Sequence, residues 1–224
     1  MSEPLILAID SATHTVSISV CSPNAVLATH SILSSSNLPA PTASIANGVQ
    51  HVLRSASVYS HQILLLAIPQ GPGSFNGLRS AFAFAKGFAL QQGCALACIP
   101  TLQISVHPLQ PKPANAIAVL QAGRGRIAAQ SFHWQNGWQP SAAGSISTWE
   151  SLFANLPATP CQLCGEVDAS MFAAAGLACP PQLMLAGNPE RSPAVLATLG
   201  YQHWQSGSDC NPLTAQPIYW QQPG

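Results

Sequence analysis

The sequence predicts an α/β protein made of two small domains. Apolar runs typical of strands alternate with stretches of helical periodicity through the first half of the chain, and a shorter series of the same kind begins near Ala116. A chain of 224 residues is long enough for one large or two small domains. Because residues 108–113 are rich in proline and resemble a linker, we place the domains at residues 1–107 and 108–224.

The first domain is predicted to order its elements as strands, helix, strand, helix. Strands are expected at residues 5–10, 16–20, 25–29 and 63–68, from apolar runs and, in the second, from strict alternation. The first helix has one apolar face, made by residues at helical spacing: Ile45, Val49, Val52, Leu53 and Ala56. The second helix is expected from about Ser74 to Gln92, directly after a glycine-rich turn.

The second domain is predicted as a shortened echo of the first, without a residue-level repeat. Its strands are expected at residues 117–120, 127–132 and 161–164, and a turn at residues 123–125 joins the first two. Short helices are expected at residues 149–156, 170–175 and 194–199.

The chain is apolar and carries few charges. Hydrophobic residues make up 47% of it and charged residues 6%, against about 25% charged in typical soluble domains. Seven Lys and Arg balance seven Asp and Glu, so no basic field exists to hold a phosphate backbone over several contacts. Binding of nucleic acid by the chain alone is therefore not expected. Since net charge keeps small domains apart in solution, so few surface charges favour a chain that is bound to a partner protein.

The sequence also predicts the cellular compartment and the state of the cysteines. No apolar run reaches the roughly eighteen residues that span a bilayer, and residues 1–4 lack the positive start of a secretory signal, so we expect a cytoplasmic protein without a membrane segment. Seven scattered cysteines suit reduced core thiols. Cys161 and Cys164 fit a buried strand better than a zinc or redox site, because no second ligand pair has the required spacing. The histidines also stand apart, so no metal and no cofactor is expected.

The most informative segment is the glycine-rich turn Gly71-Pro72-Gly73-Ser74-Phe75-Asn76-Gly77-Leu78-Arg79, between a strand and a helix. It fails the P-loop pattern, which needs Lys and Ser or Thr after the last glycine, and it fails the dinucleotide pattern, because Gly73 and Gly77 are four residues apart. A structural or interface role is therefore favoured over phosphate binding. Ser74 has the position of a helix cap.

Asp10 and Ser11 follow the first strand and allow two interpretations. An acid followed by small hydroxyl residues can hold a metal or a phosphate, but the same residues commonly form an Asx turn. The turn is favoured, since no second acid stands nearby. The other interpretation remains as an enzyme alternative, in which Asp10, Ser11, Gly71 and Gly73 bind a nucleotide.

The helix behind the glycine turn carries two rows of small residues. Ala81, Ala85 and Ala89 recur every four residues, and Ala83 and Gly87 form a neighbouring row. Rows of small side chains at this spacing let another helix approach closely. That helix is either the first helix of the same domain or a helix of a partner, and the sequence leaves both open.

Three segments resemble the TsaB (YeaZ) family: Leu7-Ala8-Ile9-Asp10-Ser11-Ala12, the glycine segment with Ala85-Lys86-Gly87 after it, and Pro217-Ile218-Tyr219. The resemblance implies the actin-like, sugar-kinase-like ATPase fold, with two domains that each place a mixed sheet beside helices. It also implies a role in the threonylcarbamoyl modification of the adenosine beside the tRNA anticodon.

In that family the protein is a non-catalytic paralogue, which here implies partners. The catalytic subunit TsaD pairs with the first two helices, the ATPase TsaE joins them, and tRNA is met only through the complex; whether the chain alone forms a homodimer is left open. The partner-binding residues that the resemblance implies are Ile45, Val49, Val52, Ser74, Phe75, Leu78, Ala81, Phe82 and Ala85. The alternative is a stand-alone ATPase or phosphotransferase that uses Asp10 and the turn from Gly71 to Gly77.

The chain departs from the family pattern in two places and from the catalytic paralogue in one. The family's His-Ser-Glu before the first helix is replaced by Ser36-Asn37-Leu38, and its Asp-Ala-Arg in the second domain by residues 121–127 with Arg124 and Arg126. The catalytic paralogue carries His-x-x-x-His on the first helix, whereas His51 stands alone here. The resemblance therefore implies the partner subunit rather than the transferase.

Overall fold

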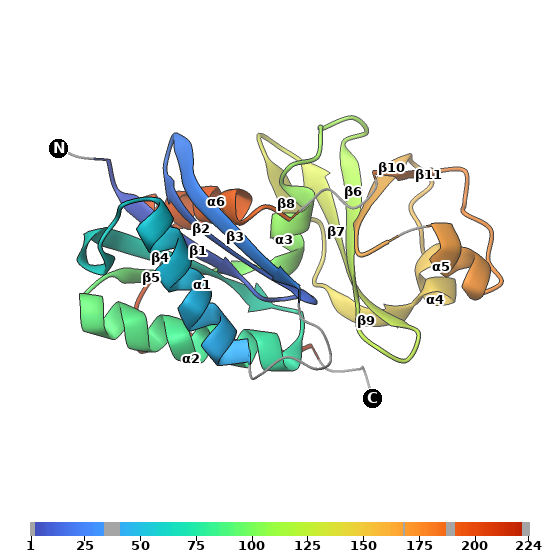
Figure 1. Cartoon of the computed structure of the whole chain (residues 1–224). Coiled ribbons are helices and arrows are strands. Elements are labelled where there is room, and N and C mark those ends of the chain that lie inside the picture. The colour runs from blue at the N-terminus through green and yellow to red at the C-terminus, as the bar shows by residue number, and fades with distance from the viewer. Residues whose placement is uncertain (1–2, 34–40, 168, 187–190, 221–224) are drawn as a thin grey trace. The chain divides into compact units, whose positions relative to one another are not determined.

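The computed structural model describes residues 3–33, 41–167, 169–186 and 191–220 of the chain. It divides into two compact units (Figure 1). Unit 1 contains residues 1–101 and 192–218, and unit 2 contains residues 102–191 and 219–224. Residues 36–38, where the family pattern is replaced, lie outside the described residues.

Unit 1 is built on a five-stranded mixed sheet in the order β3-β2-β1-β4-β5. The first three strands are antiparallel, and β4 and β5 run parallel to β1. Their bounds are β1 Leu5–Asp10, β2 Thr15–Ser22, β3 Ala25–Leu33, β4 Ile63–Gly71 and β5 Ala95–Pro100. Alternation in β2 places Ile18 and Val20 in the core, as period-two burial requires.

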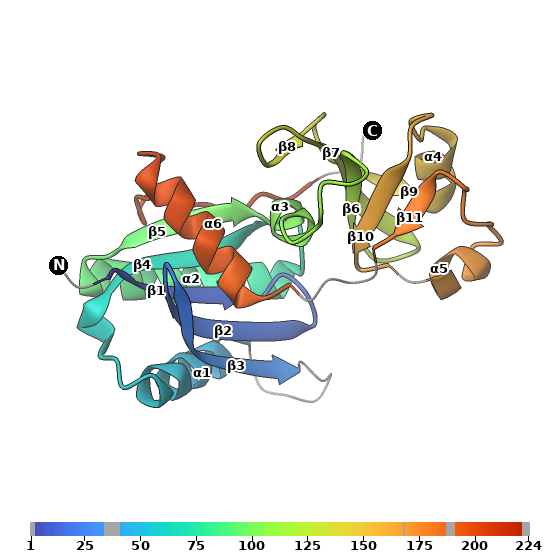
Figure 2. The same ribbon diagram turned by 90° about the horizontal axis from the view of Figure 1, so that it is seen from above.

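Helices cover both faces of this sheet. One face is covered by α1 (Pro41–Ser55) and α2 (Phe75–Gln92), whose buried residues form one core cluster with the strands. The opposite face is covered by α6 (Pro193–Gln205), where the Cα of Gly200 lies close enough to the sheet that an added Cβ would stand 2.6 Å from the Cβ of Ala67. Figure 2, seen from above, shows α6 crossing the strands on the side away from α1. A short 3-10 turn, Ser60–Gln62, precedes β4.

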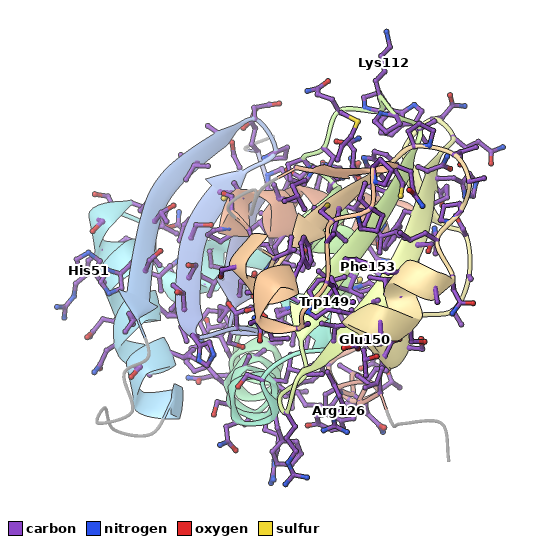
Figure 3. All side chains as sticks on the ribbon, turned by 90° about the vertical axis from the view of Figure 1, so that its right-hand side faces the viewer. His51, Lys112, Arg126, Trp149, Glu150 and Phe153 are labelled. Carbon is purple, nitrogen blue, oxygen red and sulfur yellow. The ribbon has the colours of Figure 1, made fainter. Side chains whose placement is uncertain are left out.

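Unit 2 is built on a second mixed sheet, in the order β11-β10-β6-β7-β8, with β9 paired to β7. The strands are β6 Asn115–Gln121, β7 Arg126–Trp134, β8 Trp138–Pro140, β9 Ser145–Thr148, β10 Cys161–Gly165 and β11 Leu183–Leu185. Its helices are α3 (Thr101–Val106, whose first residue belongs to unit 1), α4 (Trp149–Ala154) and α5 (Ala169–Ala174). Trp149 and Phe153 project from α4 (Figure 3) and meet Phe172 of α5 in an aromatic cluster with ring centroids 4.9–6.0 Å apart.

The α/β fold predicted from the sequence is confirmed, and each predicted strand and helix overlaps an observed one. The elements that the sequence analysis missed are the 3-10 turn Ser60–Gln62, β5, α3, β8, β9 and β11. The structural division differs from the predicted domain boundary after residue 107, mainly because residues 192–218 pack in unit 1. Among the described helices, none has both the length and the apolar character that crossing a membrane requires.

Candidate functional site

Three segments that are distant in sequence meet at the glycine turn of unit 1. The turn follows β4, and its Ser74 amide donates a hydrogen bond of 2.7 Å to the carbonyl of Ala12, in the loop after β1. In the same loop, the Ser11 hydroxyl donates to the Gly77 carbonyl over 3.0 Å. On the other side, the Ile218 amide donates to the Gln70 carbonyl over 2.8 Å. The resulting glycine junction consists of residues 10–12, 70–78 and 217–218.

Each glycine of the turn is required by a different neighbour. A Cβ at Gly71 would overlap the carbonyl oxygen of Ile218, and one at Gly77 would overlap that of Ser11. A Cβ at Gly73 would stand 2.7 Å from the carbonyl oxygen of Ala12. Backbone therefore approaches backbone at all three positions, which only glycine allows without displacement.

The backbone amides of the junction donate hydrogen bonds to other groups within the junction and its neighbouring segments. The Gly71 amide donates to the Thr101 hydroxyl over 3.1 Å, and the Gly77 amide donates to the Ser74 hydroxyl over 3.2 Å. The Ser74 amide is taken by Ala12, as described above. A phosphate cradle needs amides that point at the ligand, so these three donors are committed to the fold.

Asp10 and Ser11, the other two residues of the nucleotide alternative, also serve the junction. The Asp10 carboxyl group is buried, with 2% of the residue exposed, and its Oδ1 accepts a hydrogen bond of 3.1 Å from the Ala12 amide. This is the Asx turn that the sequence favoured, and it is confirmed. The structure thus brings Asp10, Ser11, Gly71 and Gly73 together, but as a packed corner of the fold.

The corner sets the start of α2. Ser74 is its N-cap, as predicted, and the helix ends at Gly93, whose backbone is left-handed with φ 68°. The row of Ala81, Ala85 and Ala89 is fully buried in the core cluster that also contains α1. The internal alternative for this row is therefore the correct one, and the neighbouring row of Ala83 and Gly87 is exposed.

Seven of the nine residues expected to bind a partner are buried in unit 1 and require a correction. They cannot touch a partner unless the core opens, because α1 and α2 turn these side chains toward the sheet. They are Ile45, Val49, Val52, Leu78, Ala81, Phe82 and Ala85. Ser74 and Phe75 remain exposed, and Phe75 shows 54% of its surface.

The outward side of the two helices forms a surface that we name the α1–α2 face. Its exposed members are Asn47, Gln50, His51 and Arg54 from α1 and Phe75, Arg79, Ala83, Gly87 and Leu90 from α2. Leu90 is 54% exposed, and the Arg79 guanidinium carbon lies 5.1 Å from the centre of the Phe75 ring, a cation–π contact. His51 is exposed on α1 (labelled in Figure 3), and its ring packs against the ring of His30 in β3, with ring centroids 4.5 Å apart. Apolar and small residues thus lie beside cations on one face.

The cysteine pair of unit 2 lies in β10, as predicted. Cys161 and Cys164 are buried, and burial raises the pKa of the Cys164 thiol to about 12. A thiol with so high a pKa is a poor nucleophile at neutral pH. Within the described part of the chain, no three His, Cys, Asp or Glu residues are grouped so that they could hold a metal ion.

Known proteins resemble this chain in sequence and in structure. The family model for TsaD, tRNA N6-adenosine threonylcarbamoyltransferase, matches residues 42–145. The structure of YeaZ from Pseudomonas aeruginosa superposes with a TM-score of 0.77, covering 96% of this chain and 99% of YeaZ at 17% identity. The chain has the YeaZ fold.

Two further structures agree with this assignment. An uncharacterized protein described as similar to peptidase YeaZ from P. aeruginosa superposes with a TM-score of 0.77 at 18% identity, covering 97% of this chain and all of the other. The ethanolamine utilization protein EutJ from Carboxydothermus hydrogenoformans gives a TM-score of 0.52 at 10% identity, with 89% and 91% covered. A comparison with the sequences of curated proteins gave no match. The YeaZ resemblance and the actin-like fold expected from the sequence are confirmed.

The YeaZ-like motifs gain a shared location from the structure. Residues 7–12, 71–79 and 217–218 come from three separate segments and meet at the glycine junction. Sequence reasoning missed Thr101, whose hydroxyl accepts from the Gly71 amide, because β5 before it was not predicted. A residue with a side-chain oxygen directly after a short apolar run was the only signal available.

Proposed function

We propose that this protein is a non-catalytic subunit in the threonylcarbamoyl modification of tRNA, which docks its α1–α2 face onto a TsaD-type catalytic subunit and activates it. One observation carries the proposal. The amides of Gly71, Ser74 and Gly77 in the glycine junction donate their hydrogen bonds to groups of the fold. The junction also holds the first turn of α2, so we infer that the motif fixes the direction of this helix. The TsaD family match and the YeaZ fold support the tRNA-modification context.

The enzyme alternative is less well supported by the same junction. A nucleotide at Asp10, Ser11, Gly71 and Gly73 would compete with Ala12 and Ile218, which already fill the space that the glycines leave. Asp10 is also buried beneath its own turn. We therefore propose that Asp10 stabilises the junction and takes no part in phosphate chemistry.

Reconstitution tests the proposal directly. The chain is purified with the TsaD-type and TsaE-type proteins of its own organism, and threonylcarbamoyl-adenosine in tRNA is measured by mass spectrometry. Modification is expected with all three proteins and a strong loss is expected when this chain is omitted. If the chain alone binds and hydrolyses ATP with Mg²⁺, and Asp10→Ala abolishes this, the subunit proposal is wrong and the enzyme alternative stands.

Substitutions on the exposed and buried sides of α2 test docking more specifically. Ala83→Trp places a bulky group on the exposed row and is expected to weaken the complex with the TsaD-type protein at least tenfold while the chain stays folded. Thr198→Trp on the exposed side of α6, across the sheet, is the matched control and should bind normally. Equal binding by both variants would place the docking surface elsewhere. Ala81→Leu is expected to damage folding instead, because it overpacks the core.

A further inference from the structure

Charge is distributed unevenly over unit 1. Its three basic residues, Arg54, Arg79 and Lys86, all lie on α1 and α2. Its three acidic residues, Glu3, Asp10 and Asp209, all lie elsewhere, and neither helix contains an acid. The chain has no Asp or Glu at all between residues 10 and 150. The neutral balance of the whole sequence therefore hides a face that is positive and free of acids.

These charges are available at the surface. Arg54 and Arg79 are exposed and Lys86 is half-buried. Arg79 rests against the Phe75 ring, which keeps the guanidinium beside exposed apolar surface. The three acids of the unit have other partners. Glu3 accepts a hydrogen bond from the Asn24 side chain, Asp10 is buried in its Asx turn, and Asp209 accepts hydrogen bonds from the Asn211 amide and the Thr214 hydroxyl.

The same distribution argues against a second copy of the chain as the occupant of this face. In a twofold dimer the same patch meets itself, so Arg54 and Arg79 would face a surface that offers cations and no acid. Like charges brought together across an interface disfavour that pairing, whereas a complementary potential speeds association and fixes the choice of partner. The face thus has a built-in preference for a different protein.

Nucleic acid fits the face less well than an acidic protein does. Proteins that hold a phosphate backbone commonly make about 6–10 phosphate contacts, and unit 1 has three basic residues in total. Phe75 and Leu90 are both 54% exposed on the same face and need apolar cover. A protein surface with an apolar centre and acidic residues around it matches both features.

We propose that the α1–α2 face docks onto a face of the partner subunit with an apolar centre and acidic residues around it, and that its acid-free positive composition selects this partner over a second copy of the chain. The inference rests on the proposed function and adds the chemistry that the partner must present. It assigns Arg54 and Arg79 as residues that determine specificity in docking.

Charge reversal tests the inference with the full chain and the TsaD-type protein of the same organism. The variant Arg54→Glu with Arg79→Glu is compared with Lys112→Glu and Arg124→Glu, which reverse two exposed charges in unit 2 (Lys112 is visible at the top of Figure 3). The first variant is expected to weaken the complex at least tenfold, mostly through the association rate, and the control less than twofold. Raising the salt from 50 to 300 mM should weaken the wild-type complex and reduce the difference between the variants.

Self-association of the chain is expected to change in the opposite direction to partner binding. Because neutralisation removes repulsion between two copies, sedimentation equilibrium should show stronger self-association for an Arg54→Gln, Arg79→Gln variant than for wild type. A wild-type complex that forms but is unchanged by reversal and by salt overturns this inference and leaves the proposed function intact. If no complex forms with the wild-type chain, the proposed function fails and the inference fails with it. If the wild-type chain alone binds a tRNA and reversal abolishes this, the occupant is nucleic acid and the acidic partner is wrong.

Discussion

Two glycine-rich turns in this chain follow buried strands, yet they are built for different reasons. The turn after β4 contains Gly71, Gly73 and Gly77, and at each of them an added Cβ would collide with backbone from another segment. The turn after β6 contains Gly123 and Gly125, and an added Cβ would find no atom within 4 Å at either. The first turn is closed by packing, whereas the second opens to space.

The second turn needs glycine for its backbone alone. Gly123 and Gly125 have φ of 71° and 72°, and Arg124 between them has φ of 55°. A left-handed backbone is free for glycine and costs about 1–2 kcal/mol for other residues. The same sequence signal therefore marks a junction that organises unit 1 and a hairpin turn that joins β6 to β7.

The largest expected effect is that of Gly77→Ala. Gly77 lies in the first turn of α2, where alanine is otherwise favoured, so any loss of stability comes from the collision with the Ser11 carbonyl. The nearest atom, the Ser11 carbonyl oxygen, belongs to the backbone, and overpacking costs about 1–3 kcal/mol and occasionally more, so we expect a loss at or above the upper end of this range. Urea denaturation should therefore show a much lower free energy of unfolding.

A matched glycine in the same helix makes this prediction specific. Gly87 has no atom within 4 Å of an added Cβ, so Gly87→Ala is expected to raise the free energy of unfolding by up to about 1 kcal/mol. If both substitutions change stability in the same direction, collision at the junction is not the reason for Gly77.

The second largest effect is expected from Gly71→Ala. This position combines a left-handed φ of 121° with the collision against Ile218. Ile218 is 46% exposed and belongs to the last segment of unit 1, which can move away more easily than the Ser11 loop. We expect a loss of about 2–3 kcal/mol and faster proteolysis of residues 207–218. An unchanged cleavage rate in that segment would show that the tail does not depend on Gly71.

The sequence predicted the junction only in part, and the reason is physical. The spacing of Gly73 and Gly77 excluded two phosphate-binding patterns, and Ser74 and Asp10 had the chemistry of a cap and an Asx turn, all of which are local properties. Which segment fills the space beside each glycine depends on contacts between residues far apart in the chain. Those contacts, with Ala12 and Ile218, leave no local pattern.

The direction of the small-residue rows illustrates the same limit. Ala81 and Ala83 have the same side chain, and only the position of α1 and the sheet decides that the first is buried and the second exposed. The placement of residues 192–218 in unit 1 also depends on distant contacts, because α6 packs on β1, β4 and β5. β5 was missed because Ala95–Pro100 is short and follows the preceding helix with little interruption.

A smaller effect is expected in the open turn of unit 2. Gly123→Ala and Gly125→Ala meet no atoms and suffer only from the left-handed backbone, so each should cost about 1 kcal/mol. Urea denaturation measures the loss, and hydrogen exchange of the amides in β6 and β7 shows whether it stays local. A loss as large as that of Gly77→Ala would mean that the open turn is also packed, and the contrast between the two turns would fail.

The smallest effect, with the opposite sign, is expected for Arg124→Asn. Arg124 already adopts φ of 55° without being glycine, and asparagine tolerates the left-handed region better than arginine does. The side chain is exposed, so its replacement removes no packing from the core of unit 2. The free energy of unfolding should therefore rise by a few tenths of a kcal/mol. A measurable loss would show that the Arg124 side chain stabilises the turn, and that unit 2 holds this turn by more than its backbone.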